Sequence, residues 1–494
     1  MSRNERLACV GMFAIIAVTG INKATDPDLG WHLRAGQYML DTHEIVRADP
    51  FSWTMPGYPW IDHEWATDIA MYLIYRAGDL TALAMVWALL ILLTPVVLLL
   101  NRSSQVPPVL QAGVVLVVYA GIMPPMFGVR PQMLSLLFLA IVALLLARER
   151  RGDAGRSLWL LPPLFCLWAN LHGGFVAGLM YLVIVGAARV VEAYWHRQRR
   201  EGVDPATRPK ALRRLGWVIV ACVAATFLNA YGPWIYREVI QTASDKPAMT
   251  QIGEWQAPGA DPRFAGLWVA LLAAPVIVYF SKRRASLEEL LVFVVFAAMG
   301  IRSARNIAVF AIVMTPVVTA HLSSAWPRLA EELTRMPRWF GYAAMACAVL
   351  LGARQLPPAM ACWQSAEAHG RAGDYPWAVV AARSGRPLEG RGLCDYGWGG
   401  YLLWKLPGQK VFIDGRMAIW KQGSYQVFRD YCTLLLASAG CVDALDRYRF
   451  DWILMPKGAP LCQVLQASRG WRGREYPDGS ILWTPEAVGA SRRL

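Results

Sequence analysis

Long apolar runs separated by short polar connectors dominate the first 350 positions of the chain. Each run has about 15 to 22 residues, which is long enough for a helix to cross the hydrocarbon core of a bilayer. The pattern therefore predicts eleven membrane-spanning helices. They are expected at residues 7–22, 80–100, 108–125, 132–147, 157–171, 174–194, 215–231, 264–281, 286–301, 306–323 and 338–353.

The pattern changes after residue 353, where short β-rich runs such as "KVFIDGR", "FDWILMPKG" and "SILWTP" alternate with amphipathic ones. This alternation predicts a small α/β domain, connected through the Pro-containing stretch "ARQLPPAMACW". The predicted fold is thus an α-helical polytopic membrane protein with a C-terminal α/β domain. We expect a transmembrane domain over 1–353, with a long first outside loop at 23–79, and the α/β domain over 354–494.

Charge decides the predicted orientation. Only 17% of the residues are charged, against about 25% in a typical soluble protein. The net charge of +14 does not indicate nucleic-acid binding, because the basic residues lie in short connectors between apolar runs. The connectors on one side hold 20 Lys or Arg, about twice as many as the other side, as the positive-inside rule expects of cytoplasmic loops. We therefore predict a multi-pass membrane protein with a cytoplasmic N-terminus and a periplasmic 354–494.

The first apolar run could be mistaken for a signal peptide, but no small-residue cleavage site follows it, so we expect a retained span. Five of the nine cysteines fall in the predicted periplasmic domain, where oxidation is permitted. An odd number leaves at least one thiol free, and the sequence does not give the pairing. The five are Cys362, Cys394, Cys432, Cys441 and Cys462; the other four lie in predicted spans.

The predicted outside connectors carry the unusual sequence. They include "TDPDLGWHLRAG", "WIDHEWATD", "GVRPQ", "NLHGG", "IGEWQAPGADPR" and "IRSARN", whereas the inside connectors are plain and basic. Polar and ionisable groups at membrane ends are costly unless they are solvated or used. This side is therefore the predicted functional face.

The first outside loop contains "GWHLRAGQYMLDTHE", whose spacing predicts an interfacial helix with Trp31, Tyr38 and Leu40 available to the bilayer surface. Asp28 then lies at the N-terminal end of the helix, where backbone dipoles stabilise a carboxylate. Two interpretations remain open for Asp26 and Asp28. They could be helix N-caps, or one of them could present an oxygen to a ligand.

This loop resembles that of the GT-C superfamily of polyprenyl-phosphate-dependent glycosyltransferases, notably aminoarabinose and protein mannosyl transferases. In the resemblance Asp28 takes the place of the catalytic aspartate, Met39 and Leu40 match the helix end, and "DHEW" replaces a Pro-rich element. The whole chain also resembles a large group of bacterial membrane proteins that carry "DPDLWWHL", "RPQ", "NLHGG", "NPYG" and "IDGR".

The resemblance implies a hexosyl or pentosyl transferase. It would move a sugar from a polyprenyl-phosphate donor to a periplasmic glycan, lipid or protein acceptor. Such a reaction needs a carboxylate to take the proton of the acceptor. It also needs cations to hold the leaving phosphate. Asp28 is the expected base, with Asp26 as a second or orienting carboxylate.

Arginines are the expected phosphate ligands because the guanidinium group binds phosphate in a bidentate manner. Arg130, Arg302 and Arg305 all lie in predicted outside connectors next to spans. Arg302 and Arg305 are three residues apart and are expected to share one helical face. The alternative is that each arginine interacts only with lipid headgroups.

Further candidate binding residues are His63 and Glu64, which lie beside Trp60 and Trp65, a potential sugar platform. With His32 they could also hold a divalent cation; no other cofactor is expected. His172 and Glu254 are candidates for the same cavity, although a histidine at the end of a span is also common as a structural group. Asp414 and Arg416 of "FIDGR" could form a turn salt bridge or contact the acceptor.

Two other function classes stay open. A flippase or transporter of lipid-linked glycans should show inverted repeats and charges at the bilayer midplane, and neither is evident in the sequence. A non-catalytic assembly protein of envelope polysaccharide would not need the Asp28 carboxylate.

Overall fold

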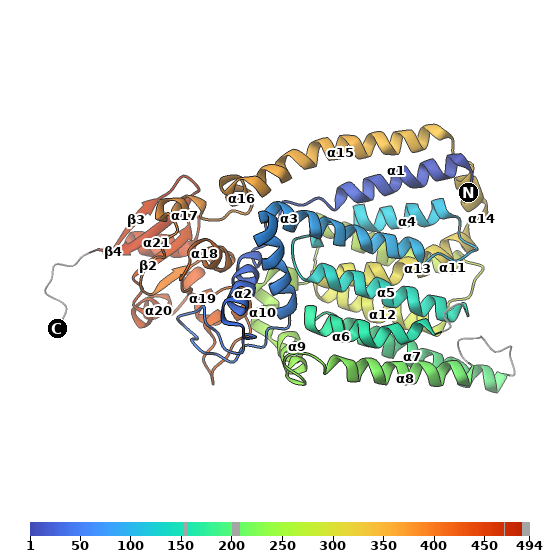
Figure 1. The fold of residues 1–494 in the computed structure, drawn as a ribbon, viewed down its shortest axis with the longest axis horizontal. Helices are drawn as coiled ribbons and strands as arrows, with labels where there is room; N and C mark the ends of the chain where they lie inside the picture. Colours follow the sequence, from blue (N-terminus) through green and yellow to red (C-terminus); the bar gives the residue numbers. More distant parts are fainter. Residues whose placement is uncertain (153–155, 200–207, 469, 487–494) are drawn as a thin grey trace. The chain divides into compact units, whose positions relative to one another are not determined.

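The structure, a computed structural model, describes residues 1–152, 156–199, 208–468 and 470–486. Within these residues the chain is mostly helical and contains a four-stranded sheet (Figure 1). It divides into two compact units. Unit 1 comprises Met1–Asn22, Met85–Pro233 and Thr250–Pro358, and unit 2 comprises Lys23–Ala84, Trp234–Met249 and Ala359–Leu494. The predicted cytoplasmic connectors at 148–156 and 196–214 lie partly outside the described residues.

Unit 1 is a helical bundle, in which α1 packs on α4, α6 on α8, and α12 on both α7 and α13. Each of the predicted spans overlaps a helix. These helices are α1 (Arg3–Thr19), the later part of α3 (Trp65–Leu100), α4 (Pro108–Gly121), α5 (Gln132–Arg150), α6 (Leu161–Leu171), α7 (Phe175–Arg199), α8 (Pro209–Thr226), α11 (Ala265–Phe280), α12 (Leu287–Arg302), α13 (Ile307–Ala325) and α15 (Arg338–Gln364), with α14 (Pro327–Thr334) between the last two.

Among the described residues, six helical segments are both long and apolar enough to cross a membrane. They are Trp65–Leu100, Gln132–Arg150, Phe175–Trp195, Pro262–Phe280, Ala304–Ala325 and Arg338–Gln364. Pro108–Gly121 and Ser157–Leu171 are shorter apolar helices. The chain is therefore a multi-span helical protein, and the count of eleven spans stays a prediction.

Two boundaries differ from the hydropathy pattern. Helix α3 begins at Trp65 and is interrupted at Gly78 and Asp79, where Asp79 has a left-handed φ of 54°. The predicted span from residue 80 is therefore only the second part of this helix. The stretch "ARQLPPAMACW" was expected to be a connector, and this is wrong because α15 continues through Pro357 and Pro358 to Gln364. The prolines remove two backbone donors, yet the flanking Ala, Gln and Leu residues favour the helix.

The sheet lies in unit 2 and has the order β1-β2-β4-β3. Its strands are β1 (Gly392–Cys394), β2 (Trp452–Pro456), β3 (Trp471–Glu475) and β4 (Ser480–Pro485). β1 is parallel to β2, with Leu393 opposite Ile453, and the remaining pairs are antiparallel. The predicted α/β character of the C-terminal part is confirmed.

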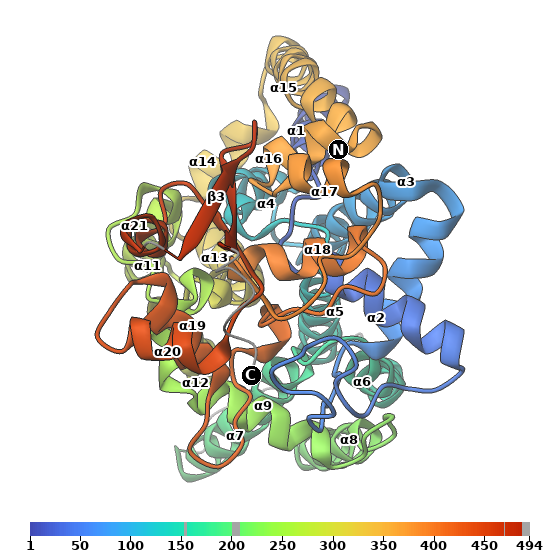
Figure 2. The same cartoon turned by 90° about the vertical axis from the view of Figure 1, so that its left-hand side faces the viewer.

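Short helices surround this sheet, and α19 packs against α20 (Figure 2). The helices of unit 2 beyond the sheet are α2 (Leu29–Thr42), α9 (Trp234–Ser244), α16 (Ala366–Ala372), α17 (Trp377–Arg383), α18 (Gly399–Lys405), α19 (Val427–Leu435), α20 (Cys441–Tyr448) and α21 (Pro460–Ala467); α10 (Lys246–Gln251) follows α9.

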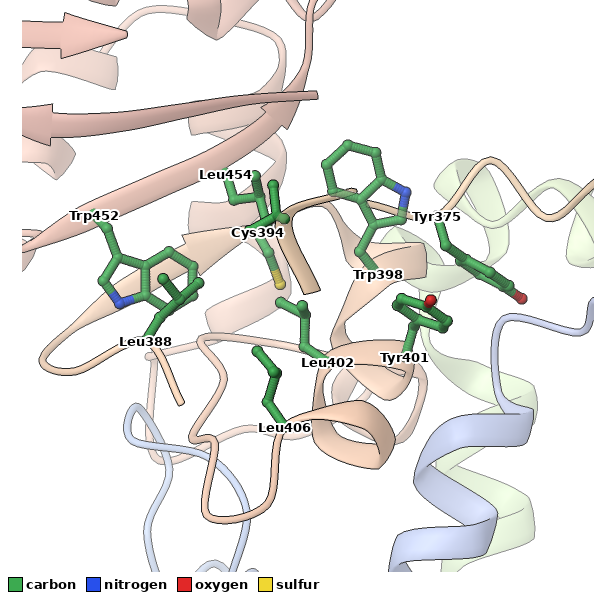
Figure 3. Packing of buried hydrophobic residues seen from close by; sticks show 10 residues of the cluster. Tyr375, Leu388, Cys394, Trp398, Tyr401, Leu402, Leu406, Trp452 and Leu454 are labelled. Carbon is green, nitrogen blue, oxygen red and sulfur yellow. The ribbon is translucent and has the colours of Figure 1, made fainter. Parts of the chain in front are cut away.

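The core beside the sheet combines apolar residues from β1, β2, α17 and α18 (Figure 3). Cys394 and Leu454 from adjacent strands meet Leu402 and Leu406 from α18 and the turn after it, and all four are buried. Burying such side chains contributes about 1.5–3 kcal/mol each relative to exposure. Tyr375 and Tyr401 extend this core as a stacked pair, with ring centroids 4.6 Å apart.

The long first loop packs against the C-terminal residues within unit 2. Helix α2 contacts α18 at two glycines, because a Cβ on Gly30 would lie 2.1 Å from the carbonyl oxygen of Gly400. Further along, Ser52 forms a parallel bridge with Val411. The loop that the hydropathy pattern placed in the first domain thus belongs to the same compact unit as most of 354–494. All nine cysteines are free thiols.

Candidate functional site in the first loop and the arginine cluster

The two aspartates at the start of α2 have different local roles. A carboxylate oxygen of Asp26 accepts the backbone N–H of Asp28 at 3.0 Å, so Asp26 closes the turn that leads into the helix. Asp28 occupies the N-cap position in a helical conformation (φ −84°, ψ −17°), and within the described residues its side chain makes no capping hydrogen bond. The N-cap interpretation therefore does not account for the Asp28 carboxylate.

The Asp28 carboxylate is oriented by a residue on the same helix. The indole Nε1–H of Trp31 donates to Oδ1 of Asp28 at 2.9 Å. The backbone of Gly415 lies close on the other side, since a Cβ there would be 1.8 Å from the same Oδ1. A side chain at position 415 would displace the carboxylate, which gives the glycine of "IDGR" a physical reason.

Behind Trp31 lies a buried histidine. The His32 ring is 3.6 Å from the Trp31 ring, centroid to centroid, and its Nδ1 lies 2.6 Å from Oδ1 of Asp68. His32 is only 2% exposed, and its Nε2 lies 3.7 Å from Glu64. These contacts fix the histidine ring and, through its close tilted contact with Trp31, the indole that orients Asp28.

Acidic groups gather around His32 in a way that the sequence patterns did not reveal. Asp62 and Asp68 are both buried, and one oxygen of each has no hydrogen-bond partner among the described residues. Burial, and then the Asp68 carboxylate, raise the pKa of Asp62 well above its usual range. Burial, and then Asp62, raise the pKa of Glu238 on α9 to about 7. Burial and the neighbouring carboxylates thus disfavour the ionised form of Asp62.

The expected sugar platform at Trp60 is wrong, because that side chain is buried. Its ring packs edge-on against Trp31, 6.2 Å away, and lies 4.7 Å from the guanidinium of Arg416. Trp31 is buried as well, so its predicted exposure to the bilayer surface is also wrong. Both indoles are buried by tertiary packing. His63 is partly exposed, and its Nε2 lies 3.7 Å from Glu64.

Arg416 is the centre of a buried ion-pair network. Its Nη2 lies 2.5 Å from Asp414 and its Nη1 lies 2.8 Å from Asp49. The predicted turn salt bridge of "FIDGR" is thus confirmed, and Asp49 adds a second partner from the first loop. Although burial opposes it, the Arg416 charge lowers the pKa of Asp49. Removing one partner of such a network leaves a buried charge uncompensated.

A second group of predicted residues comes together in unit 1. Glu254 accepts from Arg130 at 2.7 Å, and Nη1 of Arg305 lies 4.0 Å from it. The Arg305 guanidinium also lies 5.4 Å from the Trp255 ring centroid. Although burial raises the pKa of a carboxyl group, Arg305 and Arg130 outweigh it and lower the pKa of Glu254. Two cations thus share one carboxylate, and the cluster keeps a net positive charge.

Arg302 does not share a helical face with Arg305, so that expectation is wrong. Helix α12 ends at Arg302, Ser303 is extended (φ −151°), and Arg305 lies in a separate 3-10 turn over Ala304–Asn306. The helix ends before Ser303, whose hydroxyl donates to the Glu254 carbonyl at 3.2 Å. The Arg302 side chain is exposed.

His172 belongs to a structural network at the end of α6. Its Nδ1 accepts the backbone N–H of Gly174 at 2.8 Å and lies 2.6 Å from the hydroxyl of Ser135. That hydroxyl in turn accepts the indole N–H of Trp168 at 2.6 Å. Since Nδ1 is already an acceptor, the Ser135 hydroxyl is the donor to it. This arrangement accounts for the conformation of "NLHGG" through packing.

The divalent-cation hypothesis finds little geometric support. Among the residues that the structure describes, no three His, Cys, Asp or Glu side chains are arranged to hold a metal ion. His32 and Asp68 bond to each other instead of pointing at a common centre.

No protein-family model and no curated protein matches this chain. Among solved structures, it is similar to the Archaeoglobus fulgidus oligosaccharyltransferase tethered to an acceptor peptide, with a TM-score of 0.53 and 13% identity over 98% of this chain and 74% of that chain. It is also similar to the same organism's oligosaccharyltransferase AglB in complex with an inhibitory peptide and a dolichol-phosphate, with a TM-score of 0.51 and 12% identity over 99% and 76% of the two chains. The fold of this chain is therefore similar to that of an oligosaccharyltransferase, in line with the architecture implied by the GT-C resemblance.

Proposed function

We propose that the protein is a GT-C-type glycosyltransferase that moves a sugar from a polyprenyl-phosphate donor to an acceptor on the periplasmic side of a bacterial inner membrane. The acceptor is a glycan, lipid or protein. The observation that carries the proposal is the Asp28 carboxylate. It is held by Trp31 at 2.9 Å and is not used to cap its own helix. The fold similarity to an oligosaccharyltransferase, one structure of which contains a dolichol-phosphate, supports the lipid-linked donor class.

In the proposed reaction Asp28 is the general base. As the acceptor hydroxyl or amide attacks the anomeric carbon, its proton passes to a carboxylate oxygen of Asp28, and the bond from that carbon to the phosphate oxygen breaks. The Trp31 indole donates its N–H to Oδ1 and so orients the carboxylate for this proton transfer. Asp26 fixes the backbone turn and is assigned a positioning role.

We assign the lipid phosphate to Arg130 and Arg305. Charge builds on the phosphate as it leaves, and preorganised cations stabilise that charge. The pair already holds one carboxylate, Glu254, between two guanidinium groups, which is a geometry suited to an oxyanion. Arg302 is assigned only a peripheral contribution, because its side chain is exposed. His63 and Glu64 remain proposed contacts of the sugar or acceptor.

His32 and Asp68 are assigned as positioning residues. The short contact between them holds the imidazole against Trp31. A base must stay within about 0.5 Å of its productive geometry to be effective. The buried pair supplies that support without contacting the reacting atoms.

The test is a transfer assay on the purified full chain in membranes that contain a pool of radiolabelled polyprenyl-phosphate sugars. Active protein should move label from the lipid fraction into a product, and the Asp28→Asn variant should not do so above background. Label that moves only between the two leaflets, without leaving the lipid, would instead identify a flippase. If neither the unmodified protein nor the Asp28→Asn variant moves the label, and both are folded, the result would favour the assembly-protein class.

A further inference from the structure

A polar cavity lies in unit 1 at the end of the helices remote from Arg130. Its volume is about 240 Å³, and its lining includes Asn101 after α3, Arg150 at the end of α5 and Glu288 at the start of α12. Arg130 precedes α5, whose 19 residues end at Arg150, so the cavity and Arg130 are about 28 Å apart along that helix. The cavity is therefore separate from the cluster around Glu254.

Asn101 points to a ligand in this cavity. The side chain is only 3% exposed, and neither its amide oxygen nor its amide nitrogen has a hydrogen-bond partner among the described residues. An unsatisfied buried amide costs about 1–3 kcal/mol, so such groups normally have a partner in the working protein. Asn101 lines the cavity together with Ser103 and Thr319.

Arginines set the charge of the cavity wall. Arg150, Arg151 and Arg283 line it together with Glu288 and Glu289. Both carboxylates already hold cations. Glu288 pairs with Arg150 at 3.2 Å and with Arg189 at 2.8 Å.

Glu289 is similarly engaged. It pairs with Arg283, accepts the backbone N–H of Ser286 at 2.9 Å, and lies 3.4 Å from Nε2 of His321. Three arginines and two glutamates line the cavity, and both carboxylates are already paired with cations. The cavity therefore favours an anion over a cation.

We propose that this cavity binds a phosphate group, as carried by the headgroup of a membrane phospholipid. Phosphate oxygens accept hydrogen bonds from arginine guanidinium groups and from amide N–H groups. The cavity also lies at the ends of the candidate spans Trp65–Leu100 and Gln132–Arg150, the depth at which headgroups lie. Basic pockets between membrane helices bind anionic headgroups. The inference does not depend on the proposed transferase activity.

The experiment compares binding by the purified full chain in detergent with three probes. These are phosphatidylglycerol, diacylglycerol with the same acyl chains but no phosphate, and inorganic phosphate. Native mass spectrometry counts bound lipid, and thermal unfolding reports stabilisation. Phosphatidylglycerol should bind and raise the melting temperature, whereas diacylglycerol should not. If inorganic phosphate alone gives the same stabilisation, the cavity takes free phosphate; if it gives none, the headgroup is the ligand.

Variants assign the binding to the cavity. Asn101→Asp keeps the shape of the side chain and adds a negative charge, so it should weaken phosphatidylglycerol binding at least tenfold. Gln105→Glu adds the same charge to an exposed residue of the same connector and should bind like the unmodified protein. If Asn101→Asp fails to fold, Arg151→Gln at the exposed end of α5 replaces it and should weaken binding several-fold. Equal binding of both lipids, or unchanged binding in these variants, would overturn the proposal.

Discussion

The indole of Trp31 donates its N–H to a carboxylate oxygen of Asp28, 2.9 Å away, across one turn of α2. Both residues come from the same twelve-residue motif, yet the carboxylate is also approached by Gly415, nearly 400 positions later. The Asp28 carboxylate is therefore positioned by a local contact within the helix and by a backbone segment from a distant part of the chain. The proposed chemistry depends on this position.

The substitution Asp28→Asn should abolish transfer while leaving the fold intact. Asn retains an oxygen for the Trp31 indole but cannot take a proton, so the rate should fall by about 10²–10⁴. Asp28→Ala should lose the rate equally and also cost about 1 kcal/mol of stability through the lost hydrogen bond. Product formation and the melting temperature of each variant are the measurements. If the Asp28→Asn variant is active, Asp28 is not the base. The same holds if Asp26→Asn lowers transfer more than Asp28→Asn does.

The substitution Trp31→Phe tests the positioning of the base. It should lower kcat about tenfold with little effect on KM, because the carboxylate loses its orienting donor. The acid limb of the pH–rate profile should also move to higher pH, because a hydrogen bond to the ionised form favours that form. Trp53→Phe is the matched control. It removes a hydrogen bond of 2.9 Å from the Trp53 indole N–H to the Gly392 carbonyl, in the same unit. Equal pH profiles for the two variants would refute the positioning role.

The two arginines of "IRSARN" should differ in their effect on donor binding. Arg305→Ala removes a guanidinium that faces Glu254 and Trp255 and should raise KM for the lipid donor about 10- to 100-fold. Arg302→Ala removes an exposed side chain and should change KM less than threefold. Steady-state kinetics at varied donor concentration gives both numbers. Equal effects would mean that the arginines act through the general charge of the surface.

The pH dependence of stability should show the contribution of Glu238. Its pKa is raised from 4.5 to about 7 in the folded protein, so the folded state binds more protons than the unfolded state over that range. Stability from this group is therefore present below about pH 4.5 and is lost as the pH rises to about 7.

The substitution Glu238→Gln should remove the loss of stability that accompanies ionisation of the Glu238 carboxyl group. The variant should gain melting temperature relative to the unmodified protein at pH 8 and not at pH 4.5, as measured by thermal unfolding across that range. The control is Glu367→Gln, an exposed change on α16. A constant difference between Glu238→Gln and the unmodified protein at all pH values would contradict the assignment.

The orientation in the membrane can be tested with an impermeant thiol reagent on intact cells. Lys210→Cys and Lys457→Cys are both exposed positions, in the predicted cytoplasmic connector and the predicted periplasmic domain respectively. Labelling above the parent protein is expected at 457 and not at 210. The reverse result would invert the predicted topology.

The sequence by itself determined the helical, multi-span character of the chain, the α/β nature of its C-terminal part and the helix that begins after Asp28. These features follow from hydrophobic periodicity, which is a local property. The ion pair within "FIDGR" could also be predicted, because Asp414 and Arg416 are two residues apart.

Only the tertiary structure decided which groups surround the candidate base. Asp68 lies 36 positions after His32 and Asp49 lies 367 positions before Arg416, and no local pattern marks such pairs. The same is true of Trp31, which the helical spacing assigns to the bilayer surface, and of Trp60, which the sequence assigns to a sugar platform. Their indoles are buried because residues brought together from distant parts of the chain cover them, and burial depends on those partners and not on the spacing within one helix.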